Sequence, residues 1–341
     1  MEFLIFAIGC LVVALFFLVK PWFIKHKRQK IRQQPFPQKW LAILQKHFPL
    51  YRGLPAALQK ELREKIQVFL AEKNFVGRQG QEVTDEVRVL TAAQACLLLL
   101  NRKTNYFPKL STIYIYPTAY MARRVSQSGH LVSESTQTNL GESWSSGELV
   151  LAWDAAVHGA KNTYDGRNVV FHEFAHQLDQ EDGAADGAPI LAEFSAYASW
   201  ARVLGEEYER LIRKKKKHRK TVMNKYGATN PAEFFAVAGE TFFEKPRQLE
   251  KRHPELYAEL KSYYATDPIT WYDRLHASKG DAQGRGTVLG RGTVLDNLTI
   301  SALHPHATAF VQRPQAVDAK VSEHVHLSNL PVGQSPLFLQ Q

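Results

Sequence analysis

Two histidines four residues apart are the side chains of this 341-residue chain whose spacing most directly predicts chemistry. They lie in the segment His172-Glu173-Phe174-Ala175-His176. On an α-helix, positions i and i+4 share a face, so both imidazoles can bind one metal ion. Glu173 follows the first histidine and can act as general base toward a water at that ion. This is the arrangement of zinc hydrolases, which need a third protein ligand from elsewhere.

The alternative is an ordinary helix whose two histidines are hydrogen-bonded within the core. The surrounding residues, NVVFHEFAHQLD, are otherwise mostly apolar, as in a buried helix. A charged Glu173 between two histidines would be costly to bury there without a partner. The pattern therefore favours a metal site.

The third ligand is not specified by the local motif. A metzincin would place glycine and histidine three and six residues after His176, but Asp179 and Asp182 stand there. Glu233 is the best candidate, because the segment around it is strongly apolar. Glu240 lies two turns further along the same face and competes with it. Sequence alone also allows either glutamate to be an ordinary exposed helical residue.

The elements that must position these residues are predicted from periodicity and capping residues. The pattern indicates a helix-rich α+β fold with a small sheet before the helices. A strand at 148–153 is expected to form an edge that could pair with an extended substrate. Helices are predicted over 55–72, 84–100, 168–178, 190–213, 231–243 and 255–264, and strands over 111–116 and 148–153.

Charge and cysteine content exclude several classes of protein. The net charge is +10, and the basic excess is concentrated in 20–32 and 213–220. Neither cluster is interleaved with aromatics on a recognisable module, so direct nucleic-acid binding is not expected. The two cysteines, Cys10 and Cys96, exclude a disulfide scaffold and a four-cysteine zinc module. Both are expected to be buried apolar residues.

The N-terminus predicts a membrane anchor. Residues 3–19 carry no charge, and Trp22 follows as an interfacial residue. A cleavable signal peptide is the alternative, but its basic n-region and small-residue cleavage site are missing. The basic residues follow the apolar run, which predicts a cytoplasmic catalytic domain. We therefore expect a single-pass protein of the inner (cytoplasmic) membrane, with its catalytic domain facing the cytoplasm.

Four regions are expected along the chain. They are a transmembrane anchor at 3–24, a basic linker at 25–38, a catalytic domain at 39–277 and a disordered tail at 278–341. The tail repeats GRGTVL without change and has weak periodicity. Its histidines could bind metal as a loose tract, but a solvent-exposed polar tail is the preferred interpretation.

HEFAHQLD followed by YGATNPAEFFA resembles the Mlc titration factor A family of zinc peptidases. More distantly, the chain resembles the catalytic domain of anthrax lethal factor. The stretch GESWSSGELVLAW resembles the strand that precedes the zinc helix in the family. The resemblance covers about residues 35–275. It implies a zincin-like (gluzincin) metallopeptidase domain, here preceded by one transmembrane helix.

By that resemblance, His172, His176 and Glu233 bind one Zn²⁺ and Glu173 is the general base. Tyr226 matches a tyrosine that stabilises the oxyanion, for which a phenol donor is chemically suited. The implied activity is hydrolysis of a peptide or protein substrate, with aminopeptidase activity as one option. The resemblance also implies an alternative, a regulatory protein that sequesters a transcriptional repressor with or without peptidase activity.

Overall fold

The computed structural model describes residues 6, 19–128, 131–139, 141–144 and 147–275. Most of the expected anchor and the whole expected tail therefore lie outside the described residues. Within the described part, no helix is both long and apolar enough to cross a membrane. The first helix visible there covers residues 19–32, so the expected linker at 25–38 begins inside a helix.

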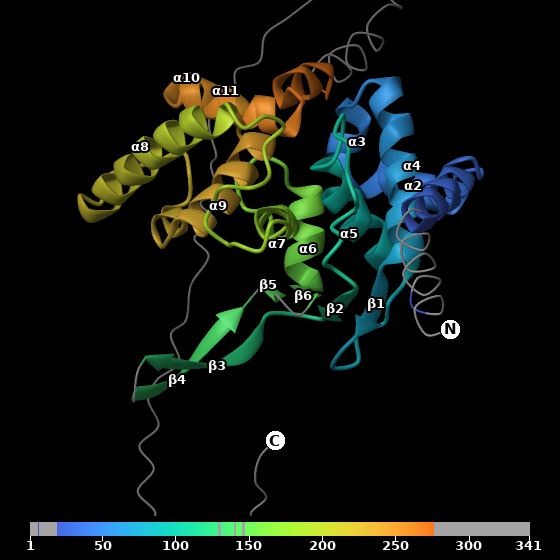
Figure 1. Ribbon diagram of the computed structural model, residues 1–341, viewed down its shortest axis with the longest axis horizontal. Helices are drawn as coiled ribbons and strands as arrows, with labels where there is room; N and C mark the ends of the chain where they lie inside the picture. The colour runs from blue at the N-terminus through green and yellow to red at the C-terminus, as the bar shows by residue number, and fades with distance from the viewer. Residues whose placement is uncertain (1–5, 7–18, 129–130, 140, 145–146, 276–341) are drawn as a thin grey trace, which may run out of the picture. The chain divides into compact units, whose positions relative to one another are not determined.

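The fold is helix-rich α+β, as the sequence predicts (Figure 1). The helices before the catalytic motif are α2 (Gln38–His47), α3 (Pro49–Gly53), α4 (Ala56–Glu72), α5 (Asp85–Leu97) and α6 (Trp153–Lys161). The motif helix and those after it are α7 (Val169–Asp179), α8 (Ala196–Lys216), the 3₁₀ helix η1 (Lys225–Ala228), α9 (Pro231–Glu244), α10 (Pro246–Arg252) and α11 (Pro254–Tyr264).

A four-stranded sheet has the order β1-β2-β6-β5. Its strands are β1 (Asn74–Gly77), β2 (Thr112–Tyr116), β5 (Gly141–Trp144) and β6 (Glu148–Ala152). The first three in spatial order are parallel, and β5 runs antiparallel to β6. The expectation that 148–153 forms an edge is wrong, because β6 is hydrogen-bonded on both sides. A separate hairpin consists of β3 (Tyr120–Ser128) and β4 (Leu131–Asn139).

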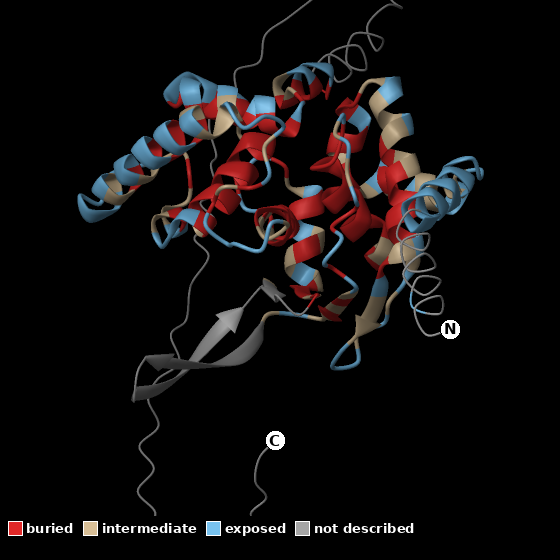
Figure 2. Cartoon of the chain, viewed as in Figure 1, coloured by how far each residue is buried: buried red, intermediate tan, exposed pale blue. Residues whose placement is uncertain are grey.

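The helices that carry the candidate site are buried against each other and against the sheet. α7 packs on β5, β6 and α9. In α9, twelve of fourteen residues are buried, and Figure 2 shows α7 and α9 largely in the colour of buried residues. Phe171 of α7 meets Phe243 of α9 at a ring separation of 5.2 Å. This packing fixes the two helices relative to each other, which is what a shared site requires.

Most predicted helices form close to their expected bounds, but one begins later. Thr84 caps α5 as predicted, by accepting a hydrogen bond from the Val87 N–H. The helix expected from residue 190 begins at Ala196. There, the backbone N–H of Leu191 donates a hydrogen bond to the Tyr197 hydroxyl, which joins the segment before α8 to the first turn of that helix. Cys96 is fully buried, as expected, while Cys10 lies outside the described residues.

Candidate metal centre

The helix α7 presents His172 and His176 on one face. It begins after Asn168, whose side-chain oxygen accepts a hydrogen bond from the Phe171 N–H. The two imidazole Nε2 atoms lie 3.2 Å apart. Both side chains are largely buried, with exposed fractions of 13% and 12%. The i, i+4 spacing therefore brings the two nitrogens together, as the sequence predicts.

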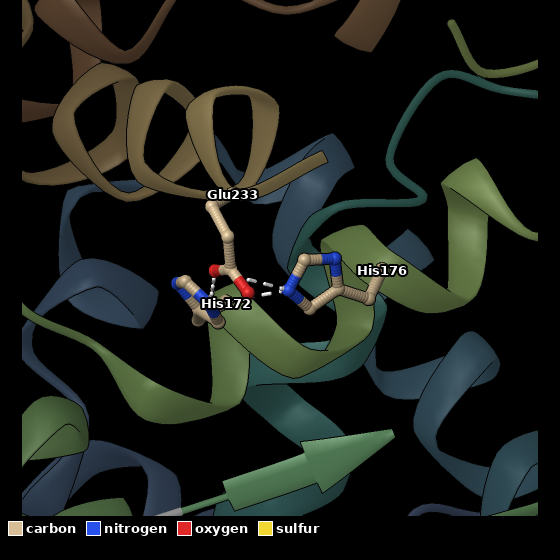
Figure 3. A group of neighbouring side chains, drawn as sticks. All are labelled: His172, His176 and Glu233. Atoms are coloured by element: carbon tan, nitrogen blue, oxygen red, sulfur yellow. Dashed lines mark hydrogen bonds and ion pairs between the residues drawn. The ribbon is translucent and has the colours of Figure 1, made fainter. Parts of the chain in front are cut away.

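The helix α9 brings Glu233 to the same point (Figure 3). Asn230 caps this helix by accepting a hydrogen bond from the Glu233 N–H at 2.9 Å, and Pro231 takes the first helical position. Glu233 consequently lies in the first turn, where its side chain reaches across to α7. Its Oε2 atom is 2.9 Å from Nε2 of His172 and 3.5 Å from Nε2 of His176.

Glu240, the competing ligand candidate, lies on the other side of the His172 ring. Its Oε1 atom is 2.7 Å from Nδ1 of His172, and its Oε2 accepts a hydrogen bond from the Asn168 N–H at 2.6 Å. A carboxylate at Nδ1 holds the proton on that nitrogen and leaves Nε2 free as a donor to a metal. The structure thus separates the two glutamates: Glu233 joins the donor set, and Glu240 orients one of its members.

The three donor atoms fit a single tetrahedral ion. Ligand atoms bound at about 2.0–2.2 Å with tetrahedral angles lie about 3.3–3.6 Å apart. The separations here are 2.9, 3.2 and 3.5 Å, close to that range. Two imidazoles and one carboxylate are also a donor set of catalytic zinc sites. His172, His176 and Glu233 therefore fit a metal ion without rearrangement of the helices.

The hydrogen bonds of the cluster raise the pKa of His172 and lower the pKa of Glu233. Burial by itself would lower the pKa of His172, but hydrogen bonds to Glu233 and Glu240 raise it well above its ordinary value. Burial would raise the pKa of Glu233, yet hydrogen bonds to both histidines hold that pKa far below its usual range. Glu233 is thus an anion across the physiological pH range, as a metal ligand must be.

Glu173 is buried in α7, and its side chain lies close to Gly141 of strand β5. Burial raises its pKa, which the neighbouring imidazoles of His172 and His176 counteract. Its Oε2 atom is buried and has no hydrogen-bond partner among the described residues. A buried carboxylate oxygen without a partner is costly, and it can be satisfied by a water at the centre.

Gly141 permits β5 to approach Glu173. A Cβ atom at this position would lie 2.6 Å from Cγ and 2.7 Å from Oε1 of Glu173. Real Cβ atoms do not come so close, so a larger residue would force the strand or the glutamate to move. In the sequence, only the family resemblance of the stretch GESWSSGELVLAW indicates that Gly141 is important.

Tyr226 lies beside the centre, in η1. Asn224 begins this short helix by accepting a hydrogen bond from the Tyr226 N–H at 3.0 Å. The ring centroids of Tyr226 and His172 are 5.9 Å apart, and the tyrosine is 48% exposed. The structure therefore brings together all five residues that the sequence analysis selected: His172, Glu173, His176, Tyr226 and Glu233.

Asp179 is buried, and its Oδ2 atom accepts a hydrogen bond from the Gly187 N–H. Burial raises its pKa to about 6. No hydrogen bond joins it to a ligand imidazole within the described residues. Its hydrogen bond with Gly187 instead holds the segment that follows α7.

Comparison with known proteins supports this interpretation of the site. Residues 23–265 match the family described as glucose-regulated metallo-peptidase M90. A protein of Synechocystis sp. named uncharacterized protein slr2042 is 42% identical over 251 residues, which cover 73% of this chain and 91% of the relative.

Two relatives carry the name Mlc titration factor A. The one from Cronobacter sakazakii is 29% identical over 239 residues, covering 68% of this chain and 88% of the relative. The one from Serratia proteamaculans is 29% identical over 235 residues, covering 67% and 88%. The resemblance seen in the sequence is thus confirmed for this family, while the distant likeness to lethal factor stays a prediction.

Proposed function

Because the chain belongs to the glucose-regulated metallopeptidase M90 family, we propose that it is a zinc-dependent peptidase that hydrolyses peptide bonds. The observation that carries the proposal is the meeting of His172, His176 and Glu233 at one point, with Glu173 beside them. Zinc is the proposed metal because two imidazoles, one carboxylate and an adjacent glutamate base are the groups that catalytic zinc sites use.

When bound, zinc would polarise both the attacking water and the substrate carbonyl. Glu173 would accept the proton of that water and then pass it to the leaving amine. Its raised pKa suits this exchange, since a base that also acts as an acid works best with a pKa nearer to neutrality. We propose that Tyr226, which is 48% exposed, donates a hydrogen bond to the oxyanion that develops on the carbonyl oxygen.

The strand β5 is the best candidate for binding the substrate backbone. Within the described residues it is the last strand of its sheet, next to β6, and its Gly141 contacts Glu173. An extended peptide that adds to this edge would pass the general base. The sequence predicts this role for 148–153, but that segment forms β6, which lies one strand further into the sheet.

The test is metal content together with hydrolysis of a chromogenic peptide by the purified chain. We expect about one zinc per chain and an activity that a chelator removes and zinc restores. Glu173→Gln should retain zinc and lose hydrolysis, because an amide cannot accept the proton. Glu206→Gln, an exposed carboxylate on α8, is the matched control and should behave as wild type. Full hydrolysis by the Glu173 variant would remove this residue from the mechanism.

A second function is suggested by the relatives named Mlc titration factor A. That name supports the proposal that this chain sequesters a transcriptional repressor. The intact set of His172, Glu173, His176 and Glu233 supports peptidase activity as well. A pull-down of repressors by the Glu173→Gln variant would separate the two, since binding should survive the loss of hydrolysis.

For localisation, we propose a single-pass inner-membrane protein with a cytoplasmic catalytic domain. The uncharged run at 3–19 and the basic residues after it support this proposal. The full chain should sediment with membranes and resist extraction by high salt. Protease added to intact spheroplasts should leave the catalytic domain uncut, whereas its digestion would reverse the topology.

A further inference from the structure

A large basic groove lies away from the metal centre, beside the first described helix, residues 19–32. Its volume is about 1300 Å³, and its walls are this helix, α4 with Lys73, and the segment 102–111. Of the described residues that line it, eight are lysine or arginine and three are glutamate. The proposed peptidase chemistry uses none of them.

The acidic residues of the groove are largely neutralised within it. Glu72 makes two bonds to the Arg28 guanidinium, at 2.7 and 2.9 Å. Glu61 lies 3.3 Å from Nζ of Lys65 and accepts a hydrogen bond from the Asn101 N–H. The groove consequently keeps an excess of positive charge facing solvent.

Lys25 and Lys103 supply part of that excess. Lys25 lies on helix 19–32 and Lys103 in the segment 102–111, and both residues are exposed. Neither makes an ion pair or side-chain hydrogen bond within the part of the chain that the structure describes. Two unpaired cations that line one groove suit a ligand that carries concentrated negative charge, such as a phosphate group.

The helix is held rigidly to the domain at its C-terminal half. The Arg28 guanidinium stacks 4.8 Å from the centroid of Tyr106, and Arg32 donates a hydrogen bond to the Tyr106 hydroxyl. Ile31 packs against the hydrophobic core. These contacts hold helix 19–32 against the domain, so this wall of the groove has a defined position.

The other half of the helix exposes apolar side chains. Val19 is 45% exposed, and Trp22 and Phe23 are each 63% exposed. Most of this helix is exposed, as Figure 2 shows by its colour. A cluster of exposed apolar and aromatic residues beside lysines is typical of a helix that meets a membrane surface. The uncharged run at 3–19 leads directly into it.

We propose that this groove binds the phosphate headgroup of an anionic phospholipid and so seats the domain against the membrane surface. The exposed Trp22 and Phe23 favour a lipid over an acidic protein or a nucleic acid as the ligand, because their apolar rings match the interfacial region of a bilayer. The cations of the groove would lie at the level of the headgroups, where anionic lipids attract them. This inference does not depend on peptidase activity.

The experiment follows the thermal unfolding of the full chain in neutral detergent micelles. Phosphatidylglycerol, phosphatidylcholine, inorganic phosphate or a short oligodeoxynucleotide is added at equal phosphate concentration. A ligand that binds the folded state raises Tm in a saturable way. We expect a saturable rise with phosphatidylglycerol only, and a smaller rise as salt is increased.

The double variant Lys25→Glu/Lys103→Glu should weaken phosphatidylglycerol binding by more than about tenfold, since each surface cation contributes severalfold to attraction. Lys217→Glu/Lys220→Glu changes the net charge equally at two exposed residues elsewhere and should keep wild-type binding. Unchanged Tm without lipid and unchanged zinc content would show that both variants fold.

Three results would overturn the proposal. An equal rise with phosphatidylcholine would show that charge is not recognised. An equal rise with inorganic phosphate or with the oligonucleotide would assign the groove to a free anion or to nucleic acid. Equal losses of phosphatidylglycerol binding in both double variants would show that binding depends only on the net charge of the protein.

Discussion

Glu240 accepts a hydrogen bond from the Nδ1–H of His172 at 2.7 Å, while Nε2 of the same ring lies 2.9 Å from the carboxylate of Glu233. One imidazole thus lies between two glutamates from a single helix. Glu240 also accepts a hydrogen bond from the Asn168 N–H at the start of α7, so it ties the beginning of that helix to α9. The orientation of a metal ligand and the packing of two helices depend on one carboxylate.

Glu240→Gln should weaken zinc binding without removing a ligand. The amide can no longer accept both hydrogen bonds, so the His172 ring loses its fixed orientation. Loss of such an outer carboxylate typically costs about 10–100-fold in metal affinity. Glu233→Gln should lose most of the zinc, because it removes one of three protein ligands.

Competition with a chelator of known affinity measures the zinc affinity of Glu240→Gln and of Glu233→Gln. If Glu240→Gln loses all zinc while Glu233→Gln keeps it, the two roles are reversed.

Gly141→Ala should impair hydrolysis more than metal binding. The new methyl would meet the Glu173 side chain at 2.6 Å, and either the base or strand β5 must move. A small displacement of a catalytic group can cost about a hundredfold, so we expect kcat/KM to fall by more than about tenfold. Zinc content should stay near one per chain.

Gly205→Ala is the matched control for this substitution, because nothing lies within 4 Å of a Cβ there. It should leave kcat/KM unchanged and, on helix α8, should not reduce stability. Wild-type kinetics for Gly141→Ala would mean that β5 does not constrain Glu173.

Asp179→Asn should change how stability depends on pH. Burial raises the pKa of Asp179 from 3.8 in the unfolded chain to about 6. Its protonation therefore favours folding below about pH 4, and this contribution is lost as the pH rises through about 6. The shift of about two pKa units corresponds to about 3 kcal/mol at most. The asparagine cannot ionise, so the variant should gain stability relative to wild type between pH 4 and pH 7.

Urea unfolding at pH 4.5, 6 and 8 measures this difference, with other titrating groups common to both proteins. Asp182→Asn, at an exposed neighbouring position, should show no such gain. A constant difference between Asp179→Asn and wild type across the three pH values would mean that Asp179 titrates as in the unfolded chain.

The effect of an N-terminal deletion on the stability of the domain should depend on where the deletion ends. Deleting 1–18 leaves helix 19–32 and its contacts, so stability should hardly change. Deleting 1–34 removes the Arg28 bonds to Glu72 and the Arg32 bond to Tyr106, together with the packing of Ile31. These are worth on the order of 2–4 kcal/mol. Tm should then fall by about 5–10 °C for a domain of this size.

Calorimetry of both truncated chains measures this contrast. Equal Tm values would show that the helix contributes nothing to the stability of the domain.

The parts of the site that depend on residues close together in the chain could be predicted from the amino-acid sequence. The spacing of His172 and His176 places both on one helical face, and Asn230 with Pro231 specifies where α9 begins. Capping residues and apolar periodicity located most helices for the same reason, since these interactions span only a few residues. The family resemblance named Glu233 and Tyr226, but the residues alone left Glu233 and Glu240 open.

The choice between Glu233 and Glu240 as metal ligand required the three-dimensional packing of α9 on α7. They lie two turns apart on one face of α9, so periodicity treats them alike. The packing of α9 against α7 places one at Nε2 of His172 and the other at Nδ1. The edge strand was also beyond local reasoning, because an edge is defined by which strands pair. Glu233 and Glu240 meet His172 across 61 and 68 positions of the chain, and β6 is an interior strand because it pairs with both β2 and β5; no pattern within a single helix or strand specifies either outcome.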